Sequence, residues 1–260
     1  MYAVVFILGL FFGSLANVLI FRLNTGESVT FSRSKCFSCG RQLKWPELIP
    51  VLSFLFLRGR CANCGSKISR QYPALELASG ALFLLLWSEL SSNQFGQSLA
   101  LTTVAILFFW LLLIISVYDI RHKIIPSQLV YPAVVAAALF LVLGIKNFMP
   151  HIFSGLGFFA FFAILWAASK GKWMGFGDAK MAFALGLFLG WPETLAAFFF
   201  SFWLGAFFGL ILAFYNYKLK AKSYKLLSGT QIPFAPFLFA GGLFAFLWGG
   251  RIISWYLSLI

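Results

Sequence analysis

Eight strongly apolar segments dominate this chain and place it in a membrane. They cover about residues 2–21, 73–90, 99–118, 128–145, 151–169, 179–191, 194–215 and 232–250. Several reach or approach the roughly 20 residues that an α-helix needs to cross a bilayer. Their apolar residues are continuous rather than alternating, which is typical of spanning helices and not of a β-barrel. The sequence therefore predicts an all-α polytopic membrane protein with about eight transmembrane helices.

The composition excludes a soluble enzyme. Only 10% of the residues are charged and 61% are hydrophobic, whereas a soluble domain carries about 25% charged residues.

Segments 73–90 and 179–191 are short for a full crossing, so seven crossings remain possible if one segment is re-entrant. The first segment has no basic region before it, which favours a retained helix over a cleaved signal peptide.

The distribution of basic residues predicts the orientation. Residues 22–72 form the one long polar stretch and hold nine of the 20 Lys and Arg residues. Nine more lie in alternate loops on the same predicted side, and only Lys146 and Arg251 lie on the other. By the positive-inside rule, residues 22–72 are cytoplasmic and both termini face outward. The same rule accounts for the net charge of +13. We therefore expect the lipid bilayer, and no nucleic acid, as the partner of the basic residues.

The predicted cytoplasmic loop contains two paired cysteine motifs. Cys36 and Cys39 form one CxxC pair, and Cys61 and Cys64 form a second after 21 intervening residues. Two such turns can supply the four thiolates of a tetrahedral zinc site. Two disulfides or four inert thiols are the alternatives, and a cytoplasmic location argues against disulfides. Because all four ligands are thiolates, we predict a structural zinc that staples a small domain rather than a catalytic one.

Aspartate occurs only at Asp119 and Asp178. Asp119 lies where the third segment ends and Asp178 where the sixth begins, so the topology places both at the cytoplasmic level of the bundle. A dipole at the start of a helix favours the Asp178 carboxylate, whereas the end of a helix opposes charge on Asp119. Such a pair can share one proton and act as an aspartic protease dyad. Alternatively, Asp178 is an N-cap and Asp119 pairs with a basic neighbour, or both serve a proton-coupled carrier.

Together, these motifs resemble the type IV prepilin peptidases, which are membrane aspartic proteases of the GxGD kind. The resemblance covers nearly the whole chain. It rests on Gly13-Ser14 with Asn17 and Arg22-Leu23, the two CxxC pairs around Ile49-Pro50, Arg70-Gln71-Tyr72-Pro73 with Glu76, Asp119 before Ile125-Pro126, Gly175-Phe176-Gly177-Asp178, and Ile232-Pro233-Phe234-Ala235-Pro236-Phe237.

The resemblance implies an endopeptidase of the bacterial cytoplasmic (inner) membrane. Asp119 and Asp178 are implied to cleave the basic leader from type IV prepilin or pseudopilin precursors at the cytoplasmic boundary. A second implied activity N-methylates the new N-terminus with S-adenosylmethionine and is associated with residues 22–72. Glu47, Arg70 and Glu76 match charged positions of the family and are candidate cofactor contacts, or else a solvated acid and paired residues at a span end.

The domain division that follows has three parts. Residues 1–21 form the first transmembrane helix, residues 22–72 a cytoplasmic zinc-binding domain, and residues 73–260 the transmembrane protease core.

Backbone near the aspartates is a candidate for substrate binding. Pro233 and Pro236 free backbone groups at the start of the last span, and Gly175 and Gly177 permit close approach. An extended peptide can pair with such backbone in the manner of an added strand. Simple punctuation of helix ends is the alternative interpretation.

Two further function classes fit parts of the sequence. A proton- or ion-coupled carrier uses the same acids, although carriers place them near the midplane between repeats. A non-catalytic, zinc-anchored scaffold is the other alternative. His122 and His151 have no evident nucleophile partner, so we interpret them as interfacial polar residues.

Overall fold

The computed structural model describes residues 1–25, 28, 32–92, 98–218 and 232–259. This part of the chain is helical, and its only β-type pairings are two isolated bridges. Two compact units are present, Met1–Thr102 (unit 1) and Thr103–Ile260 (unit 2), with α4 (Leu99–His122) beginning in unit 1. The three-part division expected from the sequence is not tested by this grouping and stays a prediction.

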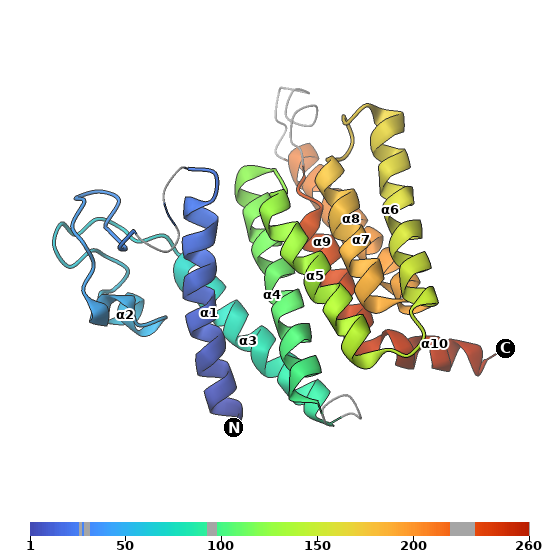
Figure 1. Cartoon of the computed structure of the whole chain (residues 1–260). Helices are drawn as coiled ribbons and strands as arrows, with labels where there is room; N and C mark the ends of the chain where they lie inside the picture. The colour runs from blue at the N-terminus through green and yellow to red at the C-terminus, as the bar shows by residue number, and fades with distance from the viewer. Residues whose placement is uncertain (26–27, 29–31, 93–97, 219–231, 260) are drawn as a thin grey trace. The chain divides into compact units, whose positions relative to one another are not determined.

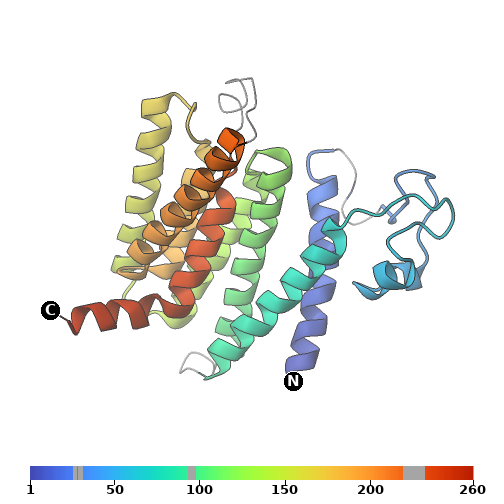
Figure 2. The ribbon, with the colours of Figure 1, turned by 180° about the vertical axis from the view of Figure 1, so that it is seen from behind.

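Unit 1 pairs two long helices, α1 (Tyr2–Arg22) and α3 (Gln71–Ser92), which lie side by side in Figures 1 and 2. Small residues of α1 make the close approach possible, because a Cβ added at Gly13 would lie 2.4 Å from the Glu76 Cα. A Cβ at Gly9 would lie 2.7 Å from the Gly80 Cα. Helices in lipid associate through such small-residue contacts. Residues 32–70, here called the lobe, connect the pair and contain η1 (Trp45–Leu48) and α2 (Leu52–Phe56).

Unit 2 is a helical bundle. It contains most of α4, then α5 (Ser127–Gly144), α6 (Met149–Ser169), α7 (Phe176–Leu189), α8 (Glu193–Lys218), α9 (Ala235–Phe244), the π-helix η4 (Ala245–Gly249) and α10 (Gly250–Leu257). Its core is aromatic: the Phe108 ring stacks on Phe188 at 4.1 Å, and Phe140 packs on Phe188 at 4.4 Å. Both ribbon views show α10 turning away from the direction of α9 (Figures 1 and 2).

Seven helices of the described residues are long and apolar enough to cross a membrane. They are Tyr2–Arg22, Gln71–Ser91, Leu99–His122, Ser127–Gly144, Met149–Ser169, Glu193–Phe214 and Ala235–Leu257. The all-α polytopic fold predicted from the sequence is therefore confirmed. Part of the predicted basic loop after α8, including Lys220, Lys222 and Lys225, lies outside the described residues.

Helix α7 is not one of those seven candidates, but it packs alongside α6 from one end to the other. Phe176 at its start packs against Trp166 near the end of α6, with ring centroids 5.0 Å apart. Gly190 just beyond its end lies against His151 at the start of α6, where an added Cβ would come within 2.6 Å of the ring. Ten of its 14 residues are buried. A helix surrounded by protein needs no lipid-matched length, which explains why the predicted segment 179–191 is short.

Candidate active site and metal centre

Asp119 lies in the last turn of α4, with only 5% of its surface exposed. Its Oδ2 atom accepts a hydrogen bond from the backbone N–H of Ala235 at 3.3 Å. One turn earlier on α4, the Ser116 hydroxyl donates to the Ala235 carbonyl at 3.2 Å. Both backbone groups of Ala235, the first residue of α9, are therefore bound by one face of α4.

This geometry changes the electrostatic expectation for Asp119. The sequence places it at the end of a helix, where the dipole opposes negative charge. In the structure, the first turn of α9 directs a backbone N–H at the carboxyl, and such N–H groups carry the positive end of the α9 dipole. The N-terminal dipole of α9 therefore offsets the unfavourable effect of the α4 C-terminus on the Asp119 carboxylate.

Asp178 lies in the first turn of α7 and is 6% exposed. Its Oδ2 atom accepts a hydrogen bond from the backbone N–H of Gly175, the N-cap residue, at 3.2 Å. This is the carboxylate half of a capping box, in which Asp178 is the N3 residue. The alternative that Asp178 is itself the N-cap is therefore wrong, because α7 begins two residues earlier, at Phe176. The Oδ1 atom is buried and has no hydrogen-bond partner among the described residues. A buried carboxyl oxygen left without a protein partner can receive a substrate or water proton.

Close packing brings the start of α7 to the segment that follows Asp119. A Cβ added at Gly177 would lie 2.5 Å from the Cβ of Ile125. Beside this contact, the Lys180 Nζ donates to the Ser127 hydroxyl at 2.9 Å, which joins α7 to the start of α5. The turn of α7 that carries Asp178 therefore packs against the segment that follows Asp119 in the chain.

Several of the residues that position the two aspartates could not be identified from the sequence. Ile125, Ser127 and Ala235 carry no chemical signal of their own, because their role comes from helix packing. Ser116 carries a weak one, since a polar residue three positions before Asp119 shares its helix face. Gly175 and Gly177 lie beside Asp178, and Pro233 and Pro236 lie beside Ala235, which binds Asp119. Their role as substrate contacts stays a prediction.

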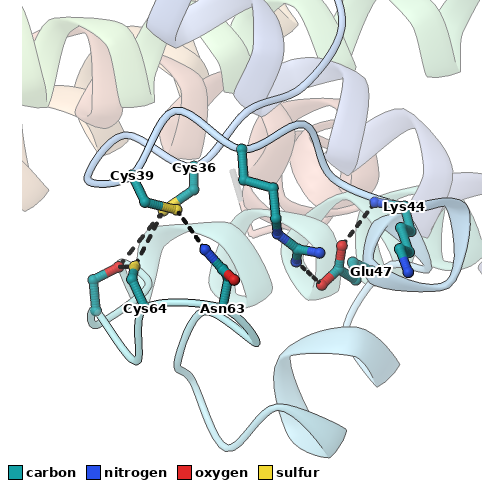
Figure 3. Close-up of polar contacts among 8 residues, drawn as sticks. Cys36, Cys39, Lys44, Glu47, Asn63 and Cys64 are labelled. Carbon is teal, nitrogen blue, oxygen red and sulfur yellow. Dashed lines mark hydrogen bonds and ion pairs between the residues drawn. The ribbon is translucent and has the colours of Figure 1, made fainter.

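The four cysteines converge in the lobe. One ligand atom from each of Cys36, Cys39, Cys61 and Cys64 lies within 4.8 Å of the other three. Figure 3 shows the first pair facing Cys64, and the Cys36 and Cys64 sulfurs are 3.9 Å apart. A tetrahedral zinc with bonds of about 2.3 Å places its sulfurs about 3.8 Å apart. The cluster therefore fits a tetrahedral metal ion.

The two cysteine turns share one backbone design. In each, the N–H of the first cysteine binds a carbonyl five residues later, and its carbonyl accepts from a glycine N–H; all four bonds are 2.9 Å long. Gly40 and Gly65 have φ angles of 71° and 70°, which glycine adopts without strain. Backbone N–H groups of Cys39 and Ser38 lower the pKa of the Cys36 thiol to about 6. The first turn thus favours the thiolate of Cys36, the form that binds metal.

Two of the other charged candidates, Glu47 and Glu76, have hydrogen-bond partners within unit 1. Glu47 binds the Arg41 side chain and accepts the Lys44 N–H at 2.7 Å (Figure 3). Buried Glu76 accepts the Val51 N–H at 2.7 Å. Arg70 lies just before α3. These contacts give Glu47 and Glu76 structural roles, and binding of S-adenosylmethionine by any of the three stays a prediction.

The contacts that the structure shows for His122 and His151 do not involve a nucleophilic side chain. The His122 ring stacks on Tyr118 at 4.3 Å, and the His151 Nδ1 lies 3.1 Å from the Leu187 carbonyl.

An apolar cavity of about 720 Å³ lies between the starts of α6 and α8, lined by residues including Met149, Trp191 and Thr194. Neither Asp119 nor Asp178 lines it, so it is separate from the aspartate site.

Comparison with known proteins agrees with both regions. Residues 7–90 match the Bacterial Peptidase A24 N-terminal domain, and residues 106–210 match the Type IV leader peptidase family. A prepilin leader peptidase/N-methyltransferase of Bacillus subtilis is 35% identical over 260 residues, which cover 100% of this chain and 99% of the relative. Proteins with the same name from Aeromonas salmonicida and Stutzerimonas stutzeri are 30% identical, over 100% and 97% of this chain and 94% and 92% of their own lengths. No solved structure matches the chain.

Proposed function

Because this chain belongs to the type IV leader peptidase family, we propose that it is a membrane aspartyl endopeptidase that removes the leader of type IV prepilin-like precursors. The full-length relatives are named prepilin leader peptidase/N-methyltransferase, which supports a second activity, N-methylation of the new N-terminus. The single observation that carries the proposal is the pair of buried carboxyls, the only aspartates of the chain, at the end of α4 and the start of α7 in one helical bundle.

Asp119 and Asp178 are the proposed catalytic residues. Two nearby buried carboxyls repel when both are ionised, so the dyad holds one shared proton in its working state. The ionised carboxylate takes a proton from a water molecule, which attacks the scissile carbonyl carbon. The protonated partner polarises the carbonyl oxygen and later gives its proton to the leaving amine. The unpartnered Asp178 Oδ1 supports this assignment, because it is available to the water or the substrate.

The substrate is proposed to be the N-terminal segment of a prepilin or pseudopilin. This segment is proposed to reach the aspartates from the cytoplasmic side. Its cleavage site must be extended, because a helical peptide bond is already hydrogen-bonded within its own helix. Gly175, Gly177, Pro233 and Pro236 are the proposed contacts to the extended backbone. Gly175 supplies the N–H group that binds Asp178, and Pro233 and Pro236 lie on either side of Ala235, whose N–H binds Asp119, which supports a role beside the reacting bond.

The cysteine cluster is proposed to hold zinc through Cys36, Cys39, Cys61 and Cys64. When bound, the ion supplies structural cross-linking of the lobe and no reaction step. S-adenosylmethionine is the proposed methyl donor, as the names of the relatives imply. Glu47, Arg70 and Glu76 remain the proposed candidates for contacting it.

The proposed location is the bacterial cytoplasmic membrane, with the N-terminus outside and residues 22–72 on the cytoplasmic side. The asymmetric distribution of Lys and Arg supports this orientation. Seven candidate spans support membrane insertion itself.

The test is cleavage of a synthetic prepilin peptide by the purified full chain in detergent, read by intact mass. We expect cleavage after the leader, and a loss on the order of a thousandfold in Asp119→Asn and in Asp178→Asn, because each removes one proton-transfer group. Both variants should keep the wild-type metal content and helicity. Added S-adenosylmethionine should add one methyl mass to the cleaved product.

Retention of wild-type cleavage by either variant would contradict the dyad. A folded, metal-loaded wild type that cleaves none of several leader peptides would favour the carrier or the scaffold instead. A carrier should then show substrate-dependent proton movement in vesicles that Asp178→Asn abolishes.

A further inference from the structure

An apolar stretch of the lobe is exposed where a water-facing domain would be polar. Residues 45–57, WPELIPVLSFLFL, include one charged residue, Glu47, and its two carboxylate oxygens bind the Arg41 side chain and the Lys44 N–H. Trp45 is 77% exposed and Phe56 is 83% exposed, and Leu48, Leu52 and Leu55 are exposed as well. Contiguous apolar surface of this kind marks an interaction site.

A part-buried hydrogen bond holds this stretch against the membrane helices of unit 1. The Val51 N–H donates to the Glu76 Oε2 at 2.7 Å, and Glu76 lies directly against Gly13 of α1. Gly13 precedes Arg22, the last residue of α1, by nine residues, which is about 13 Å along a helix axis. The Glu76 backbone, whose side chain holds the centre of the stretch, therefore lies more than two helical turns below the end of α1.

The ribbon views agree with this depth. Figures 1 and 2 show α2 at the level of the middle of α1 rather than beyond its last turn. Val51 has a φ angle of 61°, which is rare for a β-branched residue. This strained turn directs the Val51 N–H at Glu76, so the position is enforced by the structure rather than left to a free loop. Because α1 is itself a candidate span, the depth lies within the bilayer.

Basic residues bound the stretch at both ends. Lys44 precedes it, Arg58 and Arg60 follow it, and all three are exposed. Long cationic side chains at the ends of an embedded segment reach the phosphate level while their stems stay in apolar surroundings. Apolar residues between cationic ends are typical of segments that lie in a membrane interface.

We propose that residues 45–57 form a re-entrant segment embedded in the cytoplasmic leaflet, so that lipid rather than water covers Trp45, Leu55 and Phe56. The segment anchors the cysteine cluster of the lobe at the membrane surface. The occupant of the apolar face is the acyl-chain region of the bilayer, with anionic headgroups at Lys44, Arg58 and Arg60. The Glu47–Arg41 pair beside Lys44 lies at the water-facing edge of the segment. This assignment is independent of the catalytic role proposed for the aspartates.

The test uses the full chain in vesicles of phosphatidylcholine and phosphatidylglycerol that contain a lipid with a diazirine in the middle of its acyl chain. After irradiation and digestion, lipid adducts are counted by mass spectrometry. We expect peptide 45–57 to carry adducts at a level similar to the α1 peptide and several-fold above peptide 61–67 of the cysteine cluster. Adducts on 45–57 no higher than on 61–67 would overturn the proposal, including when a second copy of the chain covers the segment.

Two variants sharpen this result. Glu76→Ala removes the acceptor of the Val51 N–H, whereas Glu76→Gln keeps an acceptor at the same position. We expect Glu76→Ala to lower the adducts on 45–57 several-fold while Glu76→Gln leaves them unchanged, with equal α1 labelling and metal content in both. If Glu76→Ala retains full labelling of 45–57 with an intact lobe, Glu76 does not set the depth and the anchoring argument fails.

Discussion

The lobe and the aspartate site assemble in opposite ways. The cysteine cluster closes through two short turns whose hydrogen bonds span at most five residues each, and the ligand pairs lie on neighbouring loops. The aspartate site draws on four separate elements of unit 2: the end of α4, the segment before α5, the start of α7 and the start of α9. The lobe is thus encoded locally, whereas the aspartate site depends on how helices pack.

This difference predicts different points of failure. A lobe with little buried apolar core relies on its metal, because binding energy substitutes for packing in small domains. The aspartate site has a large packed core and relies on close contacts at single positions, where an added methyl group cannot be absorbed. Removal of metal should therefore damage the lobe alone, and a small change at a helix contact should damage the aspartate site alone.

The largest expected effect is loss of the metal from the lobe. In Cys61→Ser we expect stoichiometric zinc to fall to near zero and residues 32–70 to become sensitive to protease, because apparent zinc binding in small domains supplies on the order of 10 kcal/mol. Metal analysis and mapped limited proteolysis measure both outcomes. Ser53→Ala, in α2 and outside the turns, is the control. Wild-type zinc content in Cys61→Ser would exclude the four-cysteine site.

Next in size is Gly177→Ala at the contact with Ile125. The added Cβ would lie 2.5 Å from a branched Cβ, so we expect α7 to shift, destabilisation of about 1–3 kcal/mol, and cleavage reduced by about 10–100-fold. Cleavage rate and thermal unfolding measure this, with zinc content unchanged. Gly157→Ala is a matched control on α6, since nothing lies within 4 Å of its added Cβ.

The double variant Gly177→Ala/Ile125→Ala tests the same contact from the other side. Ile125→Ala removes the branched side-chain atoms nearest the new methyl group, so we expect it to recover part of the lost cleavage. Additive losses in the two variants would show that Gly177 acts through something other than this contact.

The same contrast explains what the sequence could predict. The CxxC spacing of Cys36, Cys39, Cys61 and Cys64 predicts their convergence, because a local turn determines it. The apolar segments predict the spanning helices, and the topology places Asp119 and Asp178 at one end. The Ala235 N–H on Asp119 and the fit of Gly177 against Ile125 could not be predicted, because both depend on the rotation and separation of helices distant in sequence.

A smaller effect is expected from Ser116→Ala. This change removes the hydrogen bond to the Ala235 carbonyl but leaves the N–H bond from Ala235 to Asp119 in place. We expect a loss of about 0.5–1.5 kcal/mol in stability and a few-fold loss in cleavage. Ser254→Ala is the control, because the Ser254 hydroxyl binds the Arg251 carbonyl in its own helix. Equal effects of the two variants would remove the special role of the α4–α9 contact.

The smallest effect belongs to Glu47, a single ion pair of the lobe. The Lys44 N–H, and then the Arg41 side chain, hold the pKa of Glu47 below its usual value. A carboxyl with a lowered pKa in the folded state stabilises that state above its unfolded pKa of about 4.3, and this stabilisation is lost as the pH falls through the lower folded value. Glu47→Gln should therefore raise amide hydrogen exchange at residues 44–47 slightly.

That difference between wild type and Glu47→Gln should be the same at pH 7 and pH 5, since both values lie above the ordinary pKa of a glutamate. Hydrogen exchange followed by mass spectrometry of the metal-loaded protein measures it. A difference that disappears already between pH 7 and pH 5 would mean that Glu47 is protonated there and does not hold η1 as a carboxylate. Because the contact is local to the lobe, cleavage by the aspartates should not change in this variant.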